Sequence, residues 1–209
     1  MSDSLTPALL LHAYAMGVFP MAESREATDI HWVEPRHRGV FPLDGFHVSR
    51  SLARHIRRTG PRVTVDMAFS QVVAGCADRD STWINAEIAS SYQRLQVQGD
   101  AHSLEVWQGD QMIGGVYGVA IGAAFFGESM FSRAPNASKT ALTYLIHRLR
   151  AGGYQLFDTQ FLTPHLASLG AVEIPQATYQ RRLSAAISVN AHFAPAGYPP
   201  EPSPADVLG

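Results

Sequence analysis

The chain has 209 residues, of which 46% are hydrophobic and 16% charged, with a formal net charge of −2 and one Cys. This length suits one large domain or a small domain joined to a medium one, and the apolar content excludes a disordered chain. Because Cys76 is the only cysteine, an intramolecular disulfide framework and a Cys-based zinc cluster are excluded. The near-zero net charge argues against a generally basic nucleic-acid binder.

The N-terminal half is predicted to be mostly helical. Apolar periodicity and flanking Gly or Pro residues predict helices over residues 7–16, 47–59, 67–76 and 85–98. A loop-rich segment containing three prolines follows the first helix, and a short extended piece is expected at 62–65.

The C-terminal half reads as strands mixed with helices. A Gly109-Asp110 turn predicts a hairpin, and the glycine-rich strands after it suggest bulges or close backbone approach. Strands are expected at 103–107, 112–121, 123–128, 155–162 and 171–174, and helices at 136–150, 164–170 and 176–189. We therefore predict an α+β protein with a small, mostly helical N-terminal domain (1–98), a strand-rich C-terminal domain (99–190) and a loose Pro-rich tail (191–209).

No segment predicts a membrane or secretory location. The first residues lack the basic region of a signal peptide, and the longest apolar run, residues 115–126, is too short to cross a bilayer. We expect a cytoplasmic protein without membrane contact.

The helix at 47–59 carries an unusual concentration of positive charge. Arg50, Arg54, Arg57 and Arg58 share one side, and no acid lies between residues 47 and 62. Such a face suits a phosphate backbone, although a solvated surface helix is the alternative. Of the 16 Lys and Arg residues, 15 are Arg. A coding bias toward Arg is the simpler explanation of this excess.

Two further segments combine polar groups with apolar strands. Glu128 directly follows an apolar strand, where it could bind a cationic group of a substrate or pair with Arg133. Asp158 and Gln160 share one face of a second apolar strand by alternation, which indicates proton handling or a structural hydrogen-bond network.

The remaining candidates are weaker. Residues 132–142 form a small-residue loop that enters a helix and could hold a phosphate or an oxyanion, although plain helix capping is the simpler interpretation. The histidines are scattered and Cys76 has no neighbouring His, so neither a metal site nor a nucleophile is predicted.

Together, FHVSRSLAR (46–54), HSLEVW (102–107), FFGESMFSRAPNASKTAL (125–142) and DTQFLTPHLASLGAVEIP (158–175) closely resemble the leucyl/phenylalanyl-tRNA–protein transferase family. The resemblance implies a C-terminal domain with the GNAT (acetyltransferase-like) fold. It also implies an aminoacyltransferase that moves Leu, Phe or Met from aminoacyl-tRNA to the α-amino group of proteins with N-terminal Arg or Lys, creating a degradation signal. No metal or coenzyme is implied, and we expect a monomer.

The resemblance also assigns roles to residues of this chain. Asp158 and Gln160 match a catalytic pair that orients and deprotonates the incoming amine, and Glu128 matches an acid at the peptide's basic end. Trp83 matches a contact to the terminal adenosine, and the arginine helix would meet the acceptor stem. The aminoacyl pocket maps onto Val116, Phe125, Met130, Leu142, Leu145 and Phe157.

The chain departs from the family pattern in three respects. Relative to many members it begins about thirty residues later, and Met21 stands where many members have Trp. Val116, Leu145 and Phe157 also differ in size from the residues common in the family. The competing functions are a leucyltransferase acting on N-terminal Asp or Glu, a GNAT-type small-molecule N-acetyltransferase, and a non-catalytic tRNA-binding module.

Overall fold

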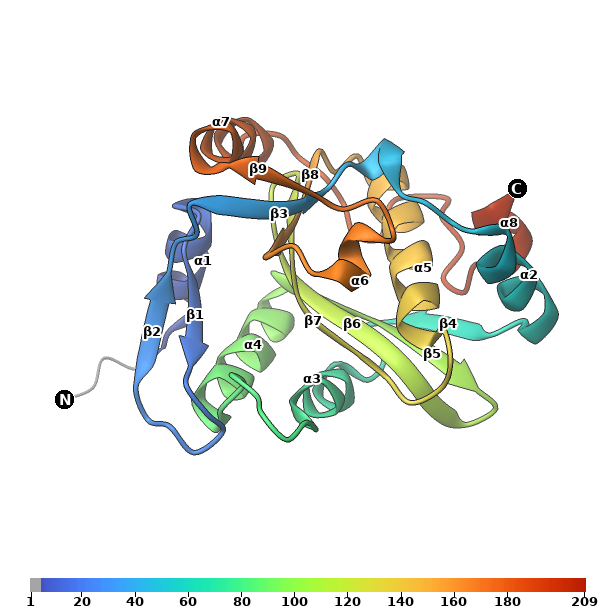
Figure 1. Cartoon of the computed structure of the whole chain (residues 1–209), viewed down its shortest axis with the longest axis horizontal. Coiled ribbons are helices and arrows are strands. Elements are labelled where there is room, and N and C mark those ends of the chain that lie inside the picture. Colours follow the sequence, from blue (N-terminus) through green and yellow to red (C-terminus); the bar gives the residue numbers. More distant parts are fainter. Residues whose placement is uncertain (1–4) are drawn as a thin grey trace.

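The computed structural model describes residues 5–209, so the first four residues of the predicted N-terminal domain lie outside it. Its central element is a seven-stranded sheet in the order β4-β5-β6-β7-β8-β3-β9 (Figure 1). The strands are β3 (His37–Phe41), β4 (Arg62–Val65), β5 (Ala101–Gln108), β6 (Gln111–Ile121), β7 (Ala124–Ser132), β8 (Leu156–Gln160) and β9 (Val172–Pro175). All neighbours pair antiparallel except β7 and β8, which are parallel. The predicted α+β class with a mixed sheet is confirmed.

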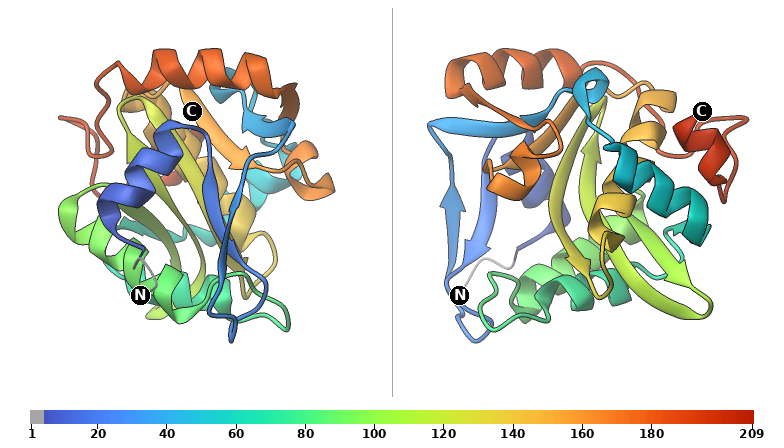
Figure 2. Two further views of the ribbon diagram at one scale, coloured as in Figure 1. Left: turned by 90° about the vertical axis from the view of Figure 1, so that its left-hand side faces the viewer. Right: turned by 45° about the vertical axis from the view of Figure 1, so that its right-hand side comes forward.

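Helices cover both faces of this sheet and define two apolar cores (Figure 2). One core contains α1 (Pro7–Ala15), α3 (Phe69–Ala77), α4 (Ala86–Gln98) and α7 (Gln176–Ile187). The other contains α2 (Arg50–Thr59), α5 (Ala137–Ala151) and α8 (Pro204–Leu208). Strand alternation divides the sheet between them, since Phe125 and Phe126 fall in different cores. Within residues 5–209 no helix combines the length and apolar character that a membrane crossing requires.

Local sequence explains most of these elements. The Asn85 side chain accepts a hydrogen bond from the backbone N–H of Ile88 and so begins α4, while Gly99 ends it in the left-handed conformation. Thr163 caps α6 (Pro164–Ala167) in the same way, with Pro164 at the first helical position. The predicted hairpin is confirmed as β5 and β6.

The proline-containing segment after α1 differs from the prediction, because it is not only loop. It forms the ribbon β1 (Phe19–Ala22) with β2 (Ile30–Val33), followed by β3 and the short 3-10 helix η1 (Leu43–Gly45). Periodicity missed these strands because each spans only four or five residues. Two strands of the main sheet, β3 and β4, come from residues before position 98, which were assigned to the N-terminal domain. The division into two domains at that position stays a prediction.

The C-terminal tail, expected to be loose, is packed. Phe193 is buried and stacks on His102 at 4.2 Å between ring centroids. Ser203 and Asp206 form a capping box that starts α8, which packs against α2 and α5. The prolines therefore shape an ordered connection and do not leave the tail unfolded.

Candidate functional site

A cavity of about 620 Å³ opens where β7 and β8 separate. These parallel strands pair only from Ala124 to Phe126 against Leu156 to Asp158, and later residues of both strands line the cavity. The apolar part of the wall comes from Phe19, Met21, Trp83, Val116, Met130, Phe131, Leu142, Phe157, Phe161 and Leu166. The size and largely apolar lining suit a small organic ligand.

Glu128 enters this cavity from a β-bulge. In the pairing of β6 with β7, Tyr117 faces Ser129 and Gly118 faces Gly127, so Glu128 is the extra residue between them. A bulge bends the strand and re-aims one side chain, and bulges are frequent beside active sites. The bulging suggested by the glycine-rich sequence is confirmed here, and its result is a carboxylate in the pocket wall.

Gln160 reaches the same cavity through an unusual backbone conformation. Its φ of 56° is in the left-handed region, which costs a non-glycine residue roughly 1–3 kcal/mol. The pairing of β3 with β8 also shifts register between Gly39 and Val40, and a Cβ on Gly39 would lie 2.6 Å from the backbone carbon of Phe161. Alternation predicts one face for Asp158 and Gln160, but this turn separates them: Gln160 lines the cavity and Asp158 does not.

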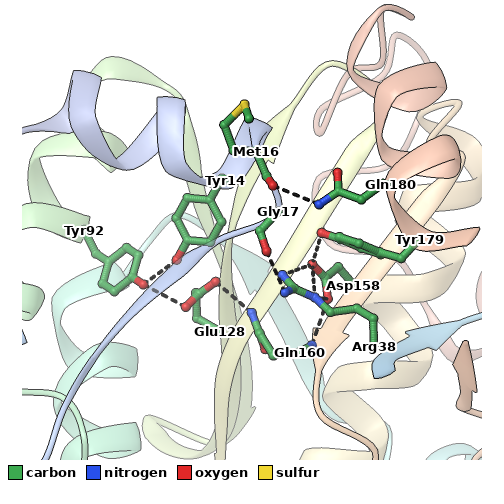
Figure 3. Close-up of polar contacts among 10 residues, drawn as sticks. All are labelled: Tyr14, Met16, Gly17, Arg38, Tyr92, Glu128, Asp158, Gln160, Tyr179 and Gln180. Carbon is green, nitrogen blue, oxygen red and sulfur yellow. Dashed lines mark hydrogen bonds and ion pairs between the residues drawn. The ribbon is translucent and has the colours of Figure 1, made fainter. Parts of the chain in front are cut away.

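Asp158 is fully buried behind the wall, where it binds three groups (Figure 3). The Arg38 guanidinium donates from Nε to Oδ1 at 2.9 Å and from Nη2 to Oδ2 at 2.7 Å. The Tyr179 hydroxyl donates to Oδ2 at 2.7 Å, and the backbone N–H of Gln160 donates to Oδ1 at 2.8 Å. Asp158 thereby holds the strained turn at Gln160 in place.

Arg38 and Tyr179 were not identified from the sequence. Burial acts to lower the pKa of Arg38, but the facing Asp158 carboxylate outweighs it, so the pKa is raised. Burial, with the Asp158 charge, raises the pKa of Tyr179 far above its usual value, so this hydroxyl remains a donor. Arg38 Nη1 also donates to the carbonyl of Gly17 at 2.8 Å, which ties β3 to the end of α1. The only sequence signal was an Arg directly before the apolar strand Gly39–Phe41.

Glu128 has different surroundings from Asp158. Its side chain is mostly buried, with the residue 8% exposed, and no Lys, Arg or His of the described chain forms an ion pair with it. Tyr92 donates to Oε2 at 2.7 Å and Gln160 Nε2 donates to Oε1 at 3.0 Å, while the Tyr14 and Tyr92 hydroxyls share a hydrogen bond of 2.5 Å (Figure 3). Burial raises the pKa of Glu128 to about 7, against the lowering effect of the tyrosine hydrogen bonds. The pocket therefore contains a carboxyl that changes charge near neutral pH.

The predicted site residues fall into three groups. Gln160, Glu128, Trp83, Val116, Met130, Leu142 and Phe157 line the cavity. Asp158, Phe125 and Leu145 are buried outside its lining, with Phe125 packed on Phe157 at 5.7 Å between ring centroids. Arg50, Arg54, Arg57 and Arg58 are exposed on α2, which contributes nothing to the cavity wall.

The wall also holds polar groups that were not predicted. Thr159 and His165 line the cavity, and their Oγ1 and Nε2 atoms are buried without a hydrogen-bond partner among residues 5–209. At the rim, Arg133 lies 3.8 Å from the largely exposed carboxylate of Asp78, and Arg79 donates to the carbonyl of Met130. Across the described residues, no three His, Cys, Asp or Glu side chains are grouped as metal ligands.

A second cavity, of about 420 Å³, adjoins the first. Met21 and Trp83 line both cavities. The remaining wall includes His31 of β2 and Ser81 and Thr82, which precede α4. The two cavities together offer an extended binding surface.

Comparison with known proteins identifies close relatives. A family model described as leucyl/phenylalanyl-tRNA protein transferase matches residues 40–184, and the model of that family's N-terminal domain matches residues 3–36. A leucyl/phenylalanyl-tRNA–protein transferase of Cereibacter sphaeroides is 65% identical over 200 residues, which cover 96% of this chain and 94% of the relative. Its counterpart in Ruegeria pomeroyi is 63% identical over 191 residues, covering 91% of each chain. The solved structure of FemX shares 14% identity, covers 82% of this chain and 70% of its own, and gives a TM-score of 0.49.

Proposed function

Because the chain belongs to the leucyl/phenylalanyl-tRNA–protein transferase family, we propose that it transfers Leu and Phe from aminoacyl-tRNA to the N-terminal amino groups of proteins. Met-tRNA is a further donor in this proposal. The acceptors are proteins that begin with Arg or Lys, and the product carries a new N-terminal residue that marks it for degradation. The observation that carries the proposal is an apolar cavity with Glu128 and Gln160 in its wall.

The apolar wall supports the choice of donor. Val116, Met130, Leu142 and Phe157 surround the aminoacyl side chain, while Phe125 and Leu145 support that wall from behind. Burial of a Leu, Phe or Met side chain contributes roughly 1.5–3 kcal/mol. Since such a wall separates apolar side chains of similar size poorly, we expect all three to be accepted.

The polar wall supports the acceptor end. Glu128 attracts the cationic N-terminal end of the acceptor, and Gln160 orients its α-amine toward the ester carbonyl. Asp158 fixes Gln160 through its backbone N–H and does not contact the substrate. An ester on tRNA is already activated, so orientation can supply roughly 7–11 kcal/mol of the barrier without a cofactor.

The acceptor assignment is tested with Leu-tRNA and peptides that differ only in their first residue. We expect leucine transfer to peptides beginning with Arg or Lys, and much less to those beginning with Ala or Asp. Transfer to Asp but not to Arg would instead identify a leucyltransferase for acidic N-termini, for which Arg79 at the rim would be the recognition group. Acetylation from acetyl-CoA without any leucine transfer would support the small-molecule acetyltransferase, and tRNA binding without transfer a binding module.

The exposed arginines of α2 support contact with the tRNA acceptor stem. Arg50, Arg54 and Arg58 have no acidic partner within the described part of the chain, and Arg57 donates to the carbonyl of Gly209. In the same proposal Trp83, which lines both cavities, contacts the terminal adenosine. We also propose that the protein acts as a monomer, and the aminoacyl-tRNA donor supports a cytoplasmic location.

Substitution of the arginines on α2 is expected to weaken tRNA binding and to make that binding less sensitive to salt. In the variant Arg54→Ala/Arg58→Ala, the magnitude of the slope of log association constant against log salt concentration should decrease by about 1.4–1.8, because each lost phosphate contact removes about 0.7–0.9. The matched control is Arg181→Ala/Arg182→Ala on the exposed side of α7. An equal change of slope in both variants, measured by titrating labelled tRNA at several salt concentrations, would contradict a specific role for α2.

A further inference from the structure

The acceptor's α-ammonium must lose a proton before its nitrogen can attack, and the structure offers two buried carboxylates near Gln160. Asp158 is the first. Its Oδ1 and Oδ2 already accept from Arg38, Tyr179 and the backbone N–H of Gln160, which fills the roughly four lone-pair sites of a carboxylate. Because it also lies outside the cavity lining, no substrate atom can reach it directly.

Glu128 is the second carboxylate, and it has both access and capacity. It lines the cavity, and its oxygens accept hydrogen bonds from Tyr92 and Gln160, with the Tyr14 hydroxyl beside them as a third hydrogen-bonding group. Since a carboxylate has roughly four lone-pair sites, one remains for a substrate proton. Since Gln160 uses its Nε2 toward Glu128, its Oε1 is left to accept an N–H of the incoming amine.

From this geometry we infer that Glu128 is the catalytic base of the transfer, and that Asp158 is a positioning residue that acts through Gln160. The inference rests on the proposed function and deepens it. One ammonium proton passes to a Glu128 oxygen, and the freed nitrogen lone pair forms the C–N bond to the ester carbonyl carbon. The carbon–oxygen bond to the ribose then breaks, and a second nitrogen proton ends on the ribose oxygen. The third proton stays on the new amide, and Glu128 releases its proton to solvent.

The groups around Glu128 suit a carboxyl that gains and loses a proton during turnover. Burial raises its pKa to about 7, close to the pKa of about 7.7–8.0 of an α-amino group, so the transfer is nearly balanced. Tyr92 and Tyr14 remain protonated because burial raises the pKa of both hydroxyls well above the usual value. The charged or titratable groups that face Glu128 are Tyr14 on α1, Tyr92 on α4, Tyr117 on β6, Arg38 on β3, Asp158 on β8 and Tyr179 on α7.

The test is the pH dependence of single-turnover leucine transfer at saturating Arg-peptide, for the wild type and Glu128→Gln. General-base catalysis contributes about 10²–10⁴-fold, so the variant should be slower by that factor at pH 6.5. Between pH 6.5 and 8.5 the free α-amine rises from about 4% to about 80%, and the variant should accelerate about twentyfold with it. The wild type should accelerate at most about fourfold as Glu128 ionises, because the ammonium that donates the proton becomes scarcer over the same range, so the deficit narrows at least about fivefold.

If the rate of Glu128→Gln relative to the wild type does not change with pH, the inference is overturned. A carboxylate that only anchors the ammonium would leave both proteins dependent on the same free amine.

Tyr92→Phe gives a second test that does not require Glu128→Gln to fold. The hydrogen bond from Tyr92 lowers the pKa of Glu128, so its loss should raise that pKa and move the acidic limb of the rate profile to higher pH. An unmoved limb would also overturn the inference. Glu173→Gln, an exposed change on β9, is the matched control. If the wild type transfers nothing to any peptide, the proposed function fails, whereas activity with a constant deficit defeats only the role of Glu128.

Discussion

Replacing Arg38 with Leu is expected to lower the free energy of unfolding by about 3–5 kcal/mol. Arg38 and Asp158 are respectively 1% and 0% exposed, so the substitution would leave a buried carboxylate without its cation. The hydrogen bonds from Tyr179 and from the backbone of Gln160 would remain, but neither supplies a positive charge. Since folded proteins are stable by roughly 5–15 kcal/mol, a loss of this size is readily measured by urea unfolding at pH 7.

A double substitution separates loss of the charge pair from loss of packing. Arg38→Leu/Asp158→Leu removes both charges and should recover much of the stability that Arg38→Leu loses, because no buried charge is left alone. Its transferase activity should remain low, since the turn at Gln160 has then lost the carboxylate that accepts from its N–H. A double variant no more stable than Arg38→Leu would contradict this account.

Glu128→Gln is expected to have the opposite effect on stability and to make the protein more stable above neutral pH. The folded protein raises the pKa of Glu128 from 4.5 to about 7, so folding disfavours the ionised form. The wild type therefore loses stability as pH rises from 4.5 to 7, by on the order of 3 kcal/mol in total, and Gln avoids this loss. Thermal or urea unfolding should show the full gain at pH 8 and almost none at pH 4.5.

The dependence on pH is what distinguishes this prediction from a general effect of substitution. Glu173→Gln, at an exposed position, should show no comparable gain at either pH. Equal stability of Glu128→Gln and the wild type at pH 8 would contradict the prediction. A gain in stability combined with a loss of activity is typical of a site whose buried charge is kept for function.

Much of the fold and part of the site could be predicted from the sequence. Helix caps such as Asn85 and Thr163 act over three residues, so local sequence is sufficient to place them. Glu128 and Gln160 were identified because polar groups beside apolar strands are costly. Their contact in the cavity wall could not be predicted, because it depends on a bulge in β7 and a left-handed residue in β8.

The groups behind the pocket were beyond sequence reasoning for a different reason. Arg38 and Asp158 are 120 positions apart, and no local pattern indicates which distant arginine meets a buried carboxylate. Alternation predicted that Asp158 and Gln160 share one face of β8, but only Gln160 lines the cavity. The left-handed backbone at Gln160 ends the regular alternation of the strand. The short strands β1 to β3 were missed because four or five residues give too few repeats for a period to be recognised.

The position of β3 in the sheet has a consequence for synthesis of the protein. This strand lies between β8 and β9, the two strands latest in the described part of the sequence, although it comes from the first fifth of these 209 residues. At about 5–20 residues per second, residue 38 emerges roughly 6–24 s before residue 158, and until then β3 has neither neighbour. The pocket therefore cannot close before β8 and β9 have been made, so a nascent chain shorter than about 175 residues cannot bind aminoacyl-tRNA by the same site.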